Sequence, residues 1–221
     1  MRAYGLPAVC VNAVVVIVLL VWLNVAQGGT QPIRILAFGA SITAGYGLDA
    51  ADSLPVQLET ALRAHGIDAT VINSGVSGET SAGGLARLDW ALADNPDLVI
   101  VDFGGNDALR AIDPKTTEAN LDAIVARLRA EKRGVLIAGM LAPPNLGADY
   151  QAAFNAVFPA VAARYDVTLY PFLLDGVATD PALNQEDGIH PNAAGVKVIV
   201  ERMLPTLLQA IQRLDRKAPG S

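Results

Sequence analysis

The sequence has one cysteine, few aromatic residues and a shortage of positive charge. Its cysteine, Cys10, lies in an apolar N-terminal run, so a chain that loses this run has no disulfide, no thiol nucleophile and no cysteine ligand for zinc. Lys and Arg number 16 against 22 for Asp and Glu, which gives a net charge of −6. This acidic excess argues against nucleic acid as a partner, because nucleic-acid binding requires clustered basic side chains. Aromatic residues make up only 5%, too few and too scattered to mark a sugar-binding groove.

The first 28 residues have the pattern of a targeting segment. Residues 8–23 are almost uninterruptedly apolar and follow a single basic residue, Arg2. Ala26 and Gly28 are small residues at the two positions that a signal peptidase reads. We therefore predict a secretory signal peptide over residues 1–28 and a periplasmic or secreted protein. The apolar run is just short of the ~20 residues that span a bilayer, so an uncleaved segment that anchors the protein to the inner membrane is the alternative.

Residues 29–221 alternate between strand-like and helical patterns and show no boundary of a second domain. Short continuous apolar runs, typical of strands buried on both faces, occur at 33–39, 69–73, 97–103, 134–140 and 167–170. Apolar residues at helical spacing occur at 53–65, 80–94, 116–133, 149–164 and 193–213. Strands that alternate with helices pair in parallel through right-handed crossovers. The sequence therefore predicts one α/β domain, a three-layer α/β/α sandwich around a five-stranded parallel sheet.

Polar, glycine-rich segments follow three of these strands. Residues 39–41 (GAS) end the first strand, residues 73–84 (NSGVSGETSAGG) follow the second and residues 104–107 (GGND) follow the third. A fourth polar segment, residues 187–192 (DGIHPN), precedes the last helix. Ligands of parallel sheets bind beyond the carboxyl ends of the strands, so we expect the four segments to meet at that edge.

Two histidines are available as a general base. His65 ends an amphipathic helix before Gly66, where its role is structural because a cation there complements the helix dipole. His190 lies three residues after Asp187, close enough for the carboxylate to bond one ring nitrogen, set the tautomer and stabilise the imidazolium. The other ring nitrogen is then free to take a proton. In the alternative interpretation, Asp187 only caps a turn and His190 is exposed.

Ser41 is the best-placed nucleophile, because it follows the first core strand directly and the domain has no cysteine. Its alternative role is to cap the turn that follows. Acyl transfer also needs donors for the developing oxyanion, and removal of one such donor raises the barrier by ~3–4 kcal/mol. Gly78 can bring a backbone N–H close to a substrate, and Asn106 offers a neutral side-chain amide, although Asn106 is also a common turn residue after two glycines.

Together, the four segments resemble the SGNH (GDSL-type) hydrolases, and most closely the secreted bacterial thioesterase I/lysophospholipase and arylesterase subgroup. The matching stretches are FGASITAGYG, NSGVSGETSAGGLARL, GGNDALR and DGIHPN, which occur in the family's order between about Ile33 and the last helix. The resemblance implies a flavodoxin-like α/β/α fold, in agreement with the strand and helix pattern, and an SGNH hydrolase domain over residues 29–221. It implies neither a metal nor a cofactor.

The resemblance also implies a role for each candidate residue. Ser41 matches the family's nucleophile, and Asp187 and His190 match its acid and base. The implied oxyanion hole consists of the backbone N–H groups of Ser41 and Gly78 and the side-chain amide of Asn106.

One position departs from the family's pattern. Ala40 stands where the motif Gly-Asp-Ser has its aspartate. That aspartate is neither the nucleophile nor the base, so the triad is retained. We expect its absence to alter the hydrogen bonds around the nucleophile turn, and with them the rate or the pH optimum.

These interpretations predict a serine esterase that hydrolyses carboxylic ester or thioester bonds through an acyl-enzyme. Its substrate would be a small-molecule ester, thioester or lysophospholipid, held in a groove lined by the loops after the third and fourth strands, including residues 141–150 (LAPPNLGADY). Two alternatives keep the same scaffold: an acyltransferase or deacetylase that acts on extracellular glycans, and a non-catalytic binding module. An α/β-hydrolase fold is disfavoured, because that fold places Gly-x-Ser-x-Gly at a later strand.

Overall fold

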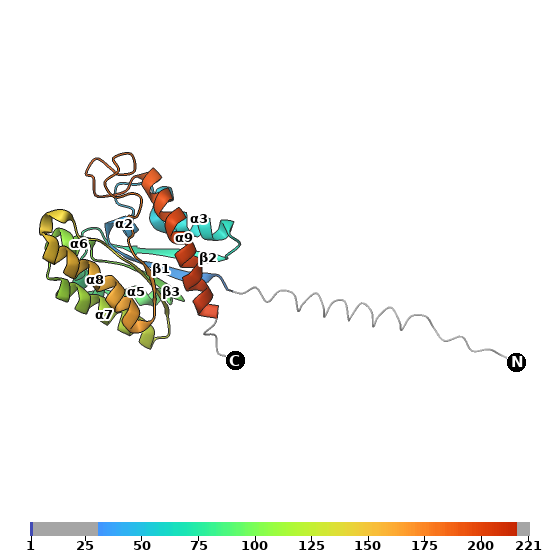
Figure 1. Cartoon of the computed structure of the whole chain (residues 1–221). Coiled ribbons are helices and arrows are strands. Elements are labelled where there is room, and N and C mark those ends of the chain that lie inside the picture. Colours follow the sequence, from blue (N-terminus) through green and yellow to red (C-terminus); the bar gives the residue numbers. More distant parts are fainter. Residues whose placement is uncertain (2–30, 216–221) are drawn as a thin grey trace. The chain divides into compact units, whose positions relative to one another are not determined.

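The computed structural model of the chain describes Met1 and residues 31–215 (Figure 1). Apart from Met1, the predicted targeting segment lies outside the described residues. Within residues 31–215, no helix is both long enough and apolar enough to cross a membrane.

Five parallel strands form one sheet in the order β2-β1-β3-β4-β5. The strands are β1 (Ile33–Gly39), β2 (Ala69–Gly75), β3 (Leu98–Asp102), β4 (Gly134–Ala138) and β5 (Thr168–Tyr170). The predicted five-stranded parallel sheet is confirmed, and the ends of each strand lie within two residues of their expected positions. The strand order reverses between β1 and β3, so the carboxyl ends of these two strands flank the crevice where open α/β sheets bind ligands.

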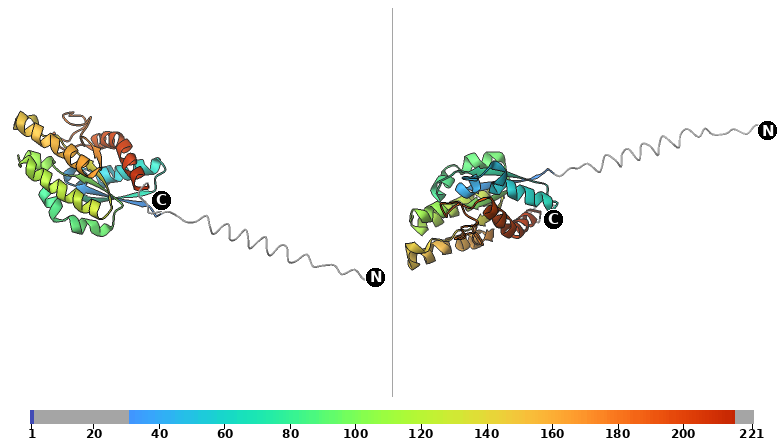
Figure 2. Two further views of the ribbon diagram at one scale, coloured as in Figure 1. Left: turned by 60° about the horizontal axis from the view of Figure 1, so that its bottom comes forward. Right: turned by 90° about the horizontal axis from the view of Figure 1, so that it is seen from above.

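Helices cover both faces of the sheet and give the three layers that the sequence predicts (Figure 2). On one face, α3 (Leu54–Ala64) packs against α9 (Ala193–Asp215). On the other face, α7 (Pro114–Ala130) packs against α8 (Ala148–Tyr165) and against α4 (Ser81–Ala86). The shorter elements are α2 (Ser41–Ala44), α5 (Leu88–Ala91), α6 (Gly105–Leu109) and the 3₁₀ turns η1 (Ala50–Asp52), η2 (Leu92–Asp94) and η3 (Pro144–Leu146).

The long helices bury the apolar side chains that the periodicity marks. Leu121, Ile124 and Leu128 of α7 are fully buried and recur at helical spacing, and Leu58 and Leu62 of α3 do the same on the opposite face. All five residues of β3 are buried as well, as expected for a strand covered on both faces. Each fully buried leucine or isoleucine contributes ~1.5–3 kcal/mol relative to an exposed one, so these layers supply most of the folding free energy.

The expected continuous helix over residues 80–94 is wrong. The structure divides this segment into α4, α5 and η2, because Arg87 leaves the helical conformation with φ −107° and ψ 9°. The Arg87 side chain then bonds to the ends of β1 and β2. The helix expected at 116–133 begins instead at Pro114, where the side chain of Asp113 accepts a hydrogen bond from the N–H of Lys115 at 2.9 Å.

The short helix α2 packs directly on the ends of β1 and β2 because both strands end in glycine. A β-carbon at Gly39 would collide with the side chain of Thr43 and with Asp102, and one at Gly75 would collide with the backbone of Ala44. This close approach places the first residue of α2 over the end of β1, at the edge where the sheet binds ligands.

Candidate active site

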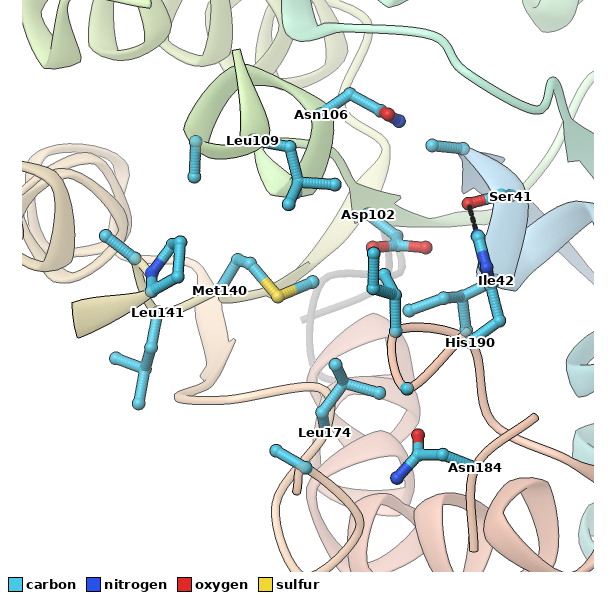
Figure 3. A pocket seen from close by; sticks show the side chains of 18 of the residues that line it. Ser41, Ile42, Asp102, Asn106, Leu109, Met140, Leu141, Leu174, Asn184 and His190 are labelled. Carbon is cyan, nitrogen blue, oxygen red and sulfur yellow. Dashed lines mark hydrogen bonds between the residues drawn. The ribbon is translucent and has the colours of Figure 1, made fainter. Parts of the chain in front are cut away.

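Ser41, His190 and Asp187 form a hydrogen-bonded line. His190 Nε2 lies 2.8 Å from Ser41 Oγ (Figure 3), and His190 Nδ1 lies 2.6 Å from Asp187 Oδ2. Ser41 begins α2 directly after β1, whereas Asp187 and His190 lie in the loop between β5 and α9. Folding therefore brings into contact a hydroxyl and an imidazole that are 149 positions apart in the sequence.

Asp187 orients the imidazole and stays ionised. Its Oδ1 accepts hydrogen bonds from the backbone N–H groups of His190 at 3.0 Å and Ile189 at 2.9 Å. Together with the bond to the ring, these contacts lower the pKa of Asp187 to about 2, and the backbone N–H of His190 has the largest effect. An ionised carboxylate can only accept, so Nδ1 carries the proton of its bond to Asp187 and Nε2 is left to accept from Ser41. Asp187 thus caps the turn and also binds His190, and the interpretation in which it only caps the turn is wrong.

Ser41 does not cap the turn that follows it, which was its alternative role. His65 lies at the end of its helix, as the sequence predicts. The N-cap of α2 is Ala40, and no side chain caps this helix; the Ser41 hydroxyl contacts His190 instead. His65 lies at the C-cap of α3, with Nδ1 2.9 Å from the carbonyl oxygen of Ala61. His190 is therefore the histidine available to Ser41.

Gly78 and Asn106 line the same cavity as Ser41. Gly78 has φ +80°, a conformation that favours glycine, and its carbonyl accepts a hydrogen bond from Arg110 Nη2 at 2.7 Å. Asn106 Nδ2 donates to the carbonyl oxygen of Glu79 at 2.9 Å, and an amide has a second N–H. Among the described residues, none accepts a hydrogen bond from the backbone N–H of Ser41 or Gly78. Three N–H groups thus remain available for an anionic oxygen.

The sequence model of the GDSL-like Lipase/Acylhydrolase family matches residues 37–198 of this chain. The matched stretch contains the five candidate site residues Ser41, Gly78, Asn106, Asp187 and His190. The chain belongs to this family. Esterase TesA of Pseudomonas aeruginosa is 42% identical over 174 residues, which cover 78% of this chain and 87% of that protein. Thioesterase 1/protease 1/lysophospholipase L1 of Escherichia coli is 36% identical over 174 residues, which cover 78% of this chain and 82% of that protein. Among solved structures, the crystal structure of AlinE4, an SGNH-hydrolase family esterase, matches with a TM-score of 0.70. The two sequences are 46% identical, and the match covers 82% of this chain and 98% of the AlinE4 chain.

In this member of the GDSL-like family, an apolar cavity of about 450 Å³ opens beside Ser41 (Figure 3). Its apolar lining includes Ile42, Leu109, Met140, Leu141, Phe172, Leu174 and Ile189. The predicted groove loop contributes residues 141–144, whereas residues 145–150 lie outside the lining. No group of three Asp, Glu, His or Cys side chains that could hold a metal ion occurs in the described part of the chain.

Arg87 holds the strand ends beside the site, a role that its sequence pattern does not reveal. Its Nη2 donates to the carbonyl oxygens of Gly39 at 3.2 Å and Ser74 at 2.9 Å, and its Nη1 donates to Ser74 Oγ at 2.9 Å. Its Nε lies 2.9 and 2.7 Å from the two carboxylate oxygens of Glu79. The stretch NSGVSGETSAGGLARL contains both Arg87 and Glu79, but helical spacing alone does not distinguish such an arginine from a solvated one.

Asp102 is a second residue whose role was not anticipated from the sequence. It ends β3, lines the cavity and is only 4% exposed, and its Oδ2 accepts a hydrogen bond from Thr43 Oγ1 at 2.7 Å. Burial raises the pKa of Asp102 to about 6, against the lowering effect of the hydrogen bonds from Thr43. The bond also ties α2 to β3, so a carboxylate holds the nucleophile turn even though Ala40 provides none. The available signal was an acidic residue at the end of the apolar stretch LVIVD, residues 98–102.

Proposed function

We propose that the protein is a serine esterase that hydrolyses carboxylic ester or thioester bonds of small molecules through an acyl-enzyme. The observation that carries the proposal is the contact between Ser41 Oγ and His190 Nε2 at 2.8 Å, made while Asp187 holds Nδ1 at 2.6 Å. A serine hydroxyl is a weak nucleophile near neutral pH and requires such a neighbouring base.

In the acylation step, His190 Nε2 takes the proton of Ser41 as Oγ attacks the acyl carbon. The carbonyl electron pair moves onto its oxygen, and the backbone N–H groups of Ser41 and Gly78 and the amide of Asn106 donate to the resulting oxyanion. His190 then gives its proton to the leaving oxygen or sulfur, and the carbonyl re-forms as an ester of Ser41. Throughout this step, ionised Asp187 stabilises the imidazolium.

Deacylation repeats these reaction steps with water as the nucleophile. His190 Nε2 takes a proton from water, and the hydroxyl oxygen attacks the acyl-enzyme carbon. The same three donors stabilise the second oxyanion, and the proton on His190 returns to Ser41 Oγ as the carboxylic acid leaves. No metal or cofactor takes part in either step.

Two observations support an acyl chain as the group that is bound. The lining of the cavity beside Ser41 is mostly apolar, as is typical of small-molecule sites with a few polar groups at the reacting atoms. Relatives of this chain are named as an esterase and as a thioesterase and lysophospholipase. We therefore propose an ester, a thioester or a lysophospholipid as the substrate.

We also propose that residues 1–28 direct export and that the hydrolase domain, residues 29–221, works in the periplasm or outside the cell. Expression of the whole chain with a C-terminal tag allows this to be tested by N-terminal sequencing of the periplasmic and membrane fractions. A mature N-terminus close to residue 29 is expected. An intact N-terminus in the membrane fraction would instead identify residues 1–28 as an anchor.

The proposed chemistry is tested with the Ser41→Ala variant. This variant should lose turnover of p-nitrophenyl acetate and labelling by a fluorophosphonate probe, while its circular dichroism spectrum and melting temperature stay close to those of the wild type. Peptide mapping of the labelled wild type should find the probe on Ser41. Undiminished turnover in Ser41→Ala, or a probe on another residue, would refute the proposal.

A further inference from the structure

Asp102 places a carboxyl group in a cavity that is otherwise mostly apolar. Among the described residues that line the cavity, Tyr46, Asp102 and His190 are the ionisable ones. In the view of Figure 3, Asp102 lies between the Ser41–His190 pair and the apolar side chains of Met140 and Leu141. Ser41, Asp102 and Leu141 therefore line one cavity.

The position of the Asp102 side chain is held by its neighbours. Asp102 is paired in register with Gly39 of β1, and the space that a side chain at position 39 would fill is occupied by the Thr43–Asp102 pair. Thr43 is 1% exposed and donates its hydroxyl proton to Asp102 at 2.7 Å. These contacts hold the carboxyl group in the wall of the cavity.

We propose that Asp102 sets the acyl-chain selectivity of the cavity according to its protonation state. With a protonated Asp102, the cavity accepts a longer apolar acyl chain, and with an ionised Asp102 it favours a short or polar acyl group. The physical reason is that an apolar chain displaces water from the carboxyl group, which costs far more for the charged form than for the neutral one. This inference rests on the proposed function, since it concerns the acyl group that Ser41 receives.

The surroundings of Asp102 allow its carboxyl group to gain or lose a proton near neutral pH. Burial raises its pKa to about 6, and the hydroxyl and backbone N–H of Thr43 offset part of that increase. The other ionisable lining residues are Tyr46, which follows α2, and His190, which lies in the loop before α9 and is bonded to Asp187. No lysine or arginine belongs to the described lining of the cavity, so no cation there holds the charge on Asp102.

The first test measures kcat/KM for p-nitrophenyl octanoate and p-nitrophenyl acetate between about pH 5 and about pH 8. The ratio of kcat/KM for octanoate to kcat/KM for acetate should fall as pH rises. The total fall should be about tenfold for each pH unit by which the bound octanoyl chain raises the pKa of Asp102. Any ionisation that affects both esters alike cancels in the ratio. In Asp102→Asn, which still offers Thr43 an acceptor oxygen, the ratio should not depend on pH.

A second variant distinguishes this role from a merely structural one. Thr43→Val removes a hydrogen bond that stabilises the ionised carboxylate, so the midpoint of the ratio's pH dependence should move to higher pH. If Asp102 only supported the fold, its replacement would lower kcat/KM for both esters by the same factor. A wild-type ratio that does not vary with pH, or one that varies equally in Asp102→Asn, would overturn the inference.

Binding without turnover gives an independent measurement. Ser41→Ala should bind methyl octanoate more tightly at about pH 5 than at about pH 8 in calorimetry, and the added Asp102→Asn substitution should abolish this difference. Ser41-dependent hydrolysis with a ratio that is independent of pH would refute only the selectivity role. Absence of Ser41-dependent hydrolysis would refute the proposed function, and the calorimetric result would still decide whether Asp102 controls chain binding.

Discussion

Arg87 binds Glu79 through its guanidinium, with Nε 2.9 and 2.7 Å from the two carboxylate oxygens, and both side chains are largely buried. The same guanidinium donates to the carbonyl oxygens of Gly39 and Ser74, at the ends of β1 and β2. The carbonyl oxygen of Glu79 in turn accepts the hydrogen bond of the Asn106 amide. One arginine thus links the strand that leads to the nucleophile, the loop of Gly78 and the side chain of Asn106.

Replacement of Arg87 by lysine should lower kcat about 100-fold and change KM little, since a small misplacement of catalytic groups costs that much. Lysine keeps the charge but cannot bond to Glu79, Ser74 and Gly39 at the same time. Steady-state kinetics with p-nitrophenyl acetate measure the effect. In Arg87→Ala, added guanidinium ion should restore part of kcat, and added methylammonium should restore less.

The matched control for Arg87 is Arg63→Lys. Arg63 pairs with Glu59 on the surface of α3, where its side chain is 57% exposed, and such pairs contribute ~0–1 kcal/mol. Its replacement should leave kcat and KM unchanged. A raised KM with normal kcat in Arg87→Lys would show that Arg87 serves substrate binding instead of the oxyanion donors.

Replacement of Asn106 by alanine should lower kcat about 10²–10³-fold, because one donor to the oxyanion is lost. KM should change little, since the amide bonds more strongly to the oxyanion than to the ground-state carbonyl. Rapid-quench measurement of the acyl-enzyme should find the acylation step slowed. A higher KM at unchanged kcat would place Asn106 in substrate binding only.

The two histidines provide a matched pair of variants. His190→Gln should lower kcat by at least about 10⁴-fold, because the proton acceptor for Ser41 is removed. His65→Gln should keep full activity, since His65 is exposed and contacts its own helix. Fluorophosphonate labelling of each variant separates nucleophile activation from folding, and equal labelling of the two would exclude His190 as the base.

The buried carboxyl of Asp102 makes stability depend on pH. Its pKa is raised from 3.8 to about 6 in the folded state, so the stabilisation is complete below pH 3.8 and is lost as pH rises through about 6. The Asp102→Asn substitution removes this loss. Relative to the wild type, the variant should therefore gain up to roughly 3 kcal/mol in free energy of unfolding between about pH 4 and about pH 8.

Urea unfolding of both proteins at the two pH values measures this gain. The quantity to compare is the change in free energy of unfolding between the two pH values within each protein. The absolute free energies are less informative, because the amide also changes the hydrogen bond with Thr43. If Asp102→Asn instead lost stability relative to the wild type as pH rose, Asp102 would be stabilised as an anion in the folded protein.

The layered architecture was readable from the sequence because its elements carry strong local patterns. The strand at Ile33–Gly39 is a continuous apolar run, and the helix Pro114–Ala130 repeats its apolar residues over several turns. The helices Ser41–Ala44 and Gly105–Leu109 are too short to show a period, so they were not anticipated. The break at Arg87 was not anticipated either, because it depends on partners in β1 and β2.

The sequence by itself determined the family, the order of the layers and the pair Asp187 and His190, whose hydrogen bond needs only three residues of chain. The tertiary structure alone decided that Ser41 meets His190, since these residues are 149 positions apart and converge only when β1 and the loop before α9 reach the same sheet edge. It also decided the buried state of Asp102. Local patterns record which neighbours along the chain fit one element, whereas contacts and burial depend on how distant elements pack.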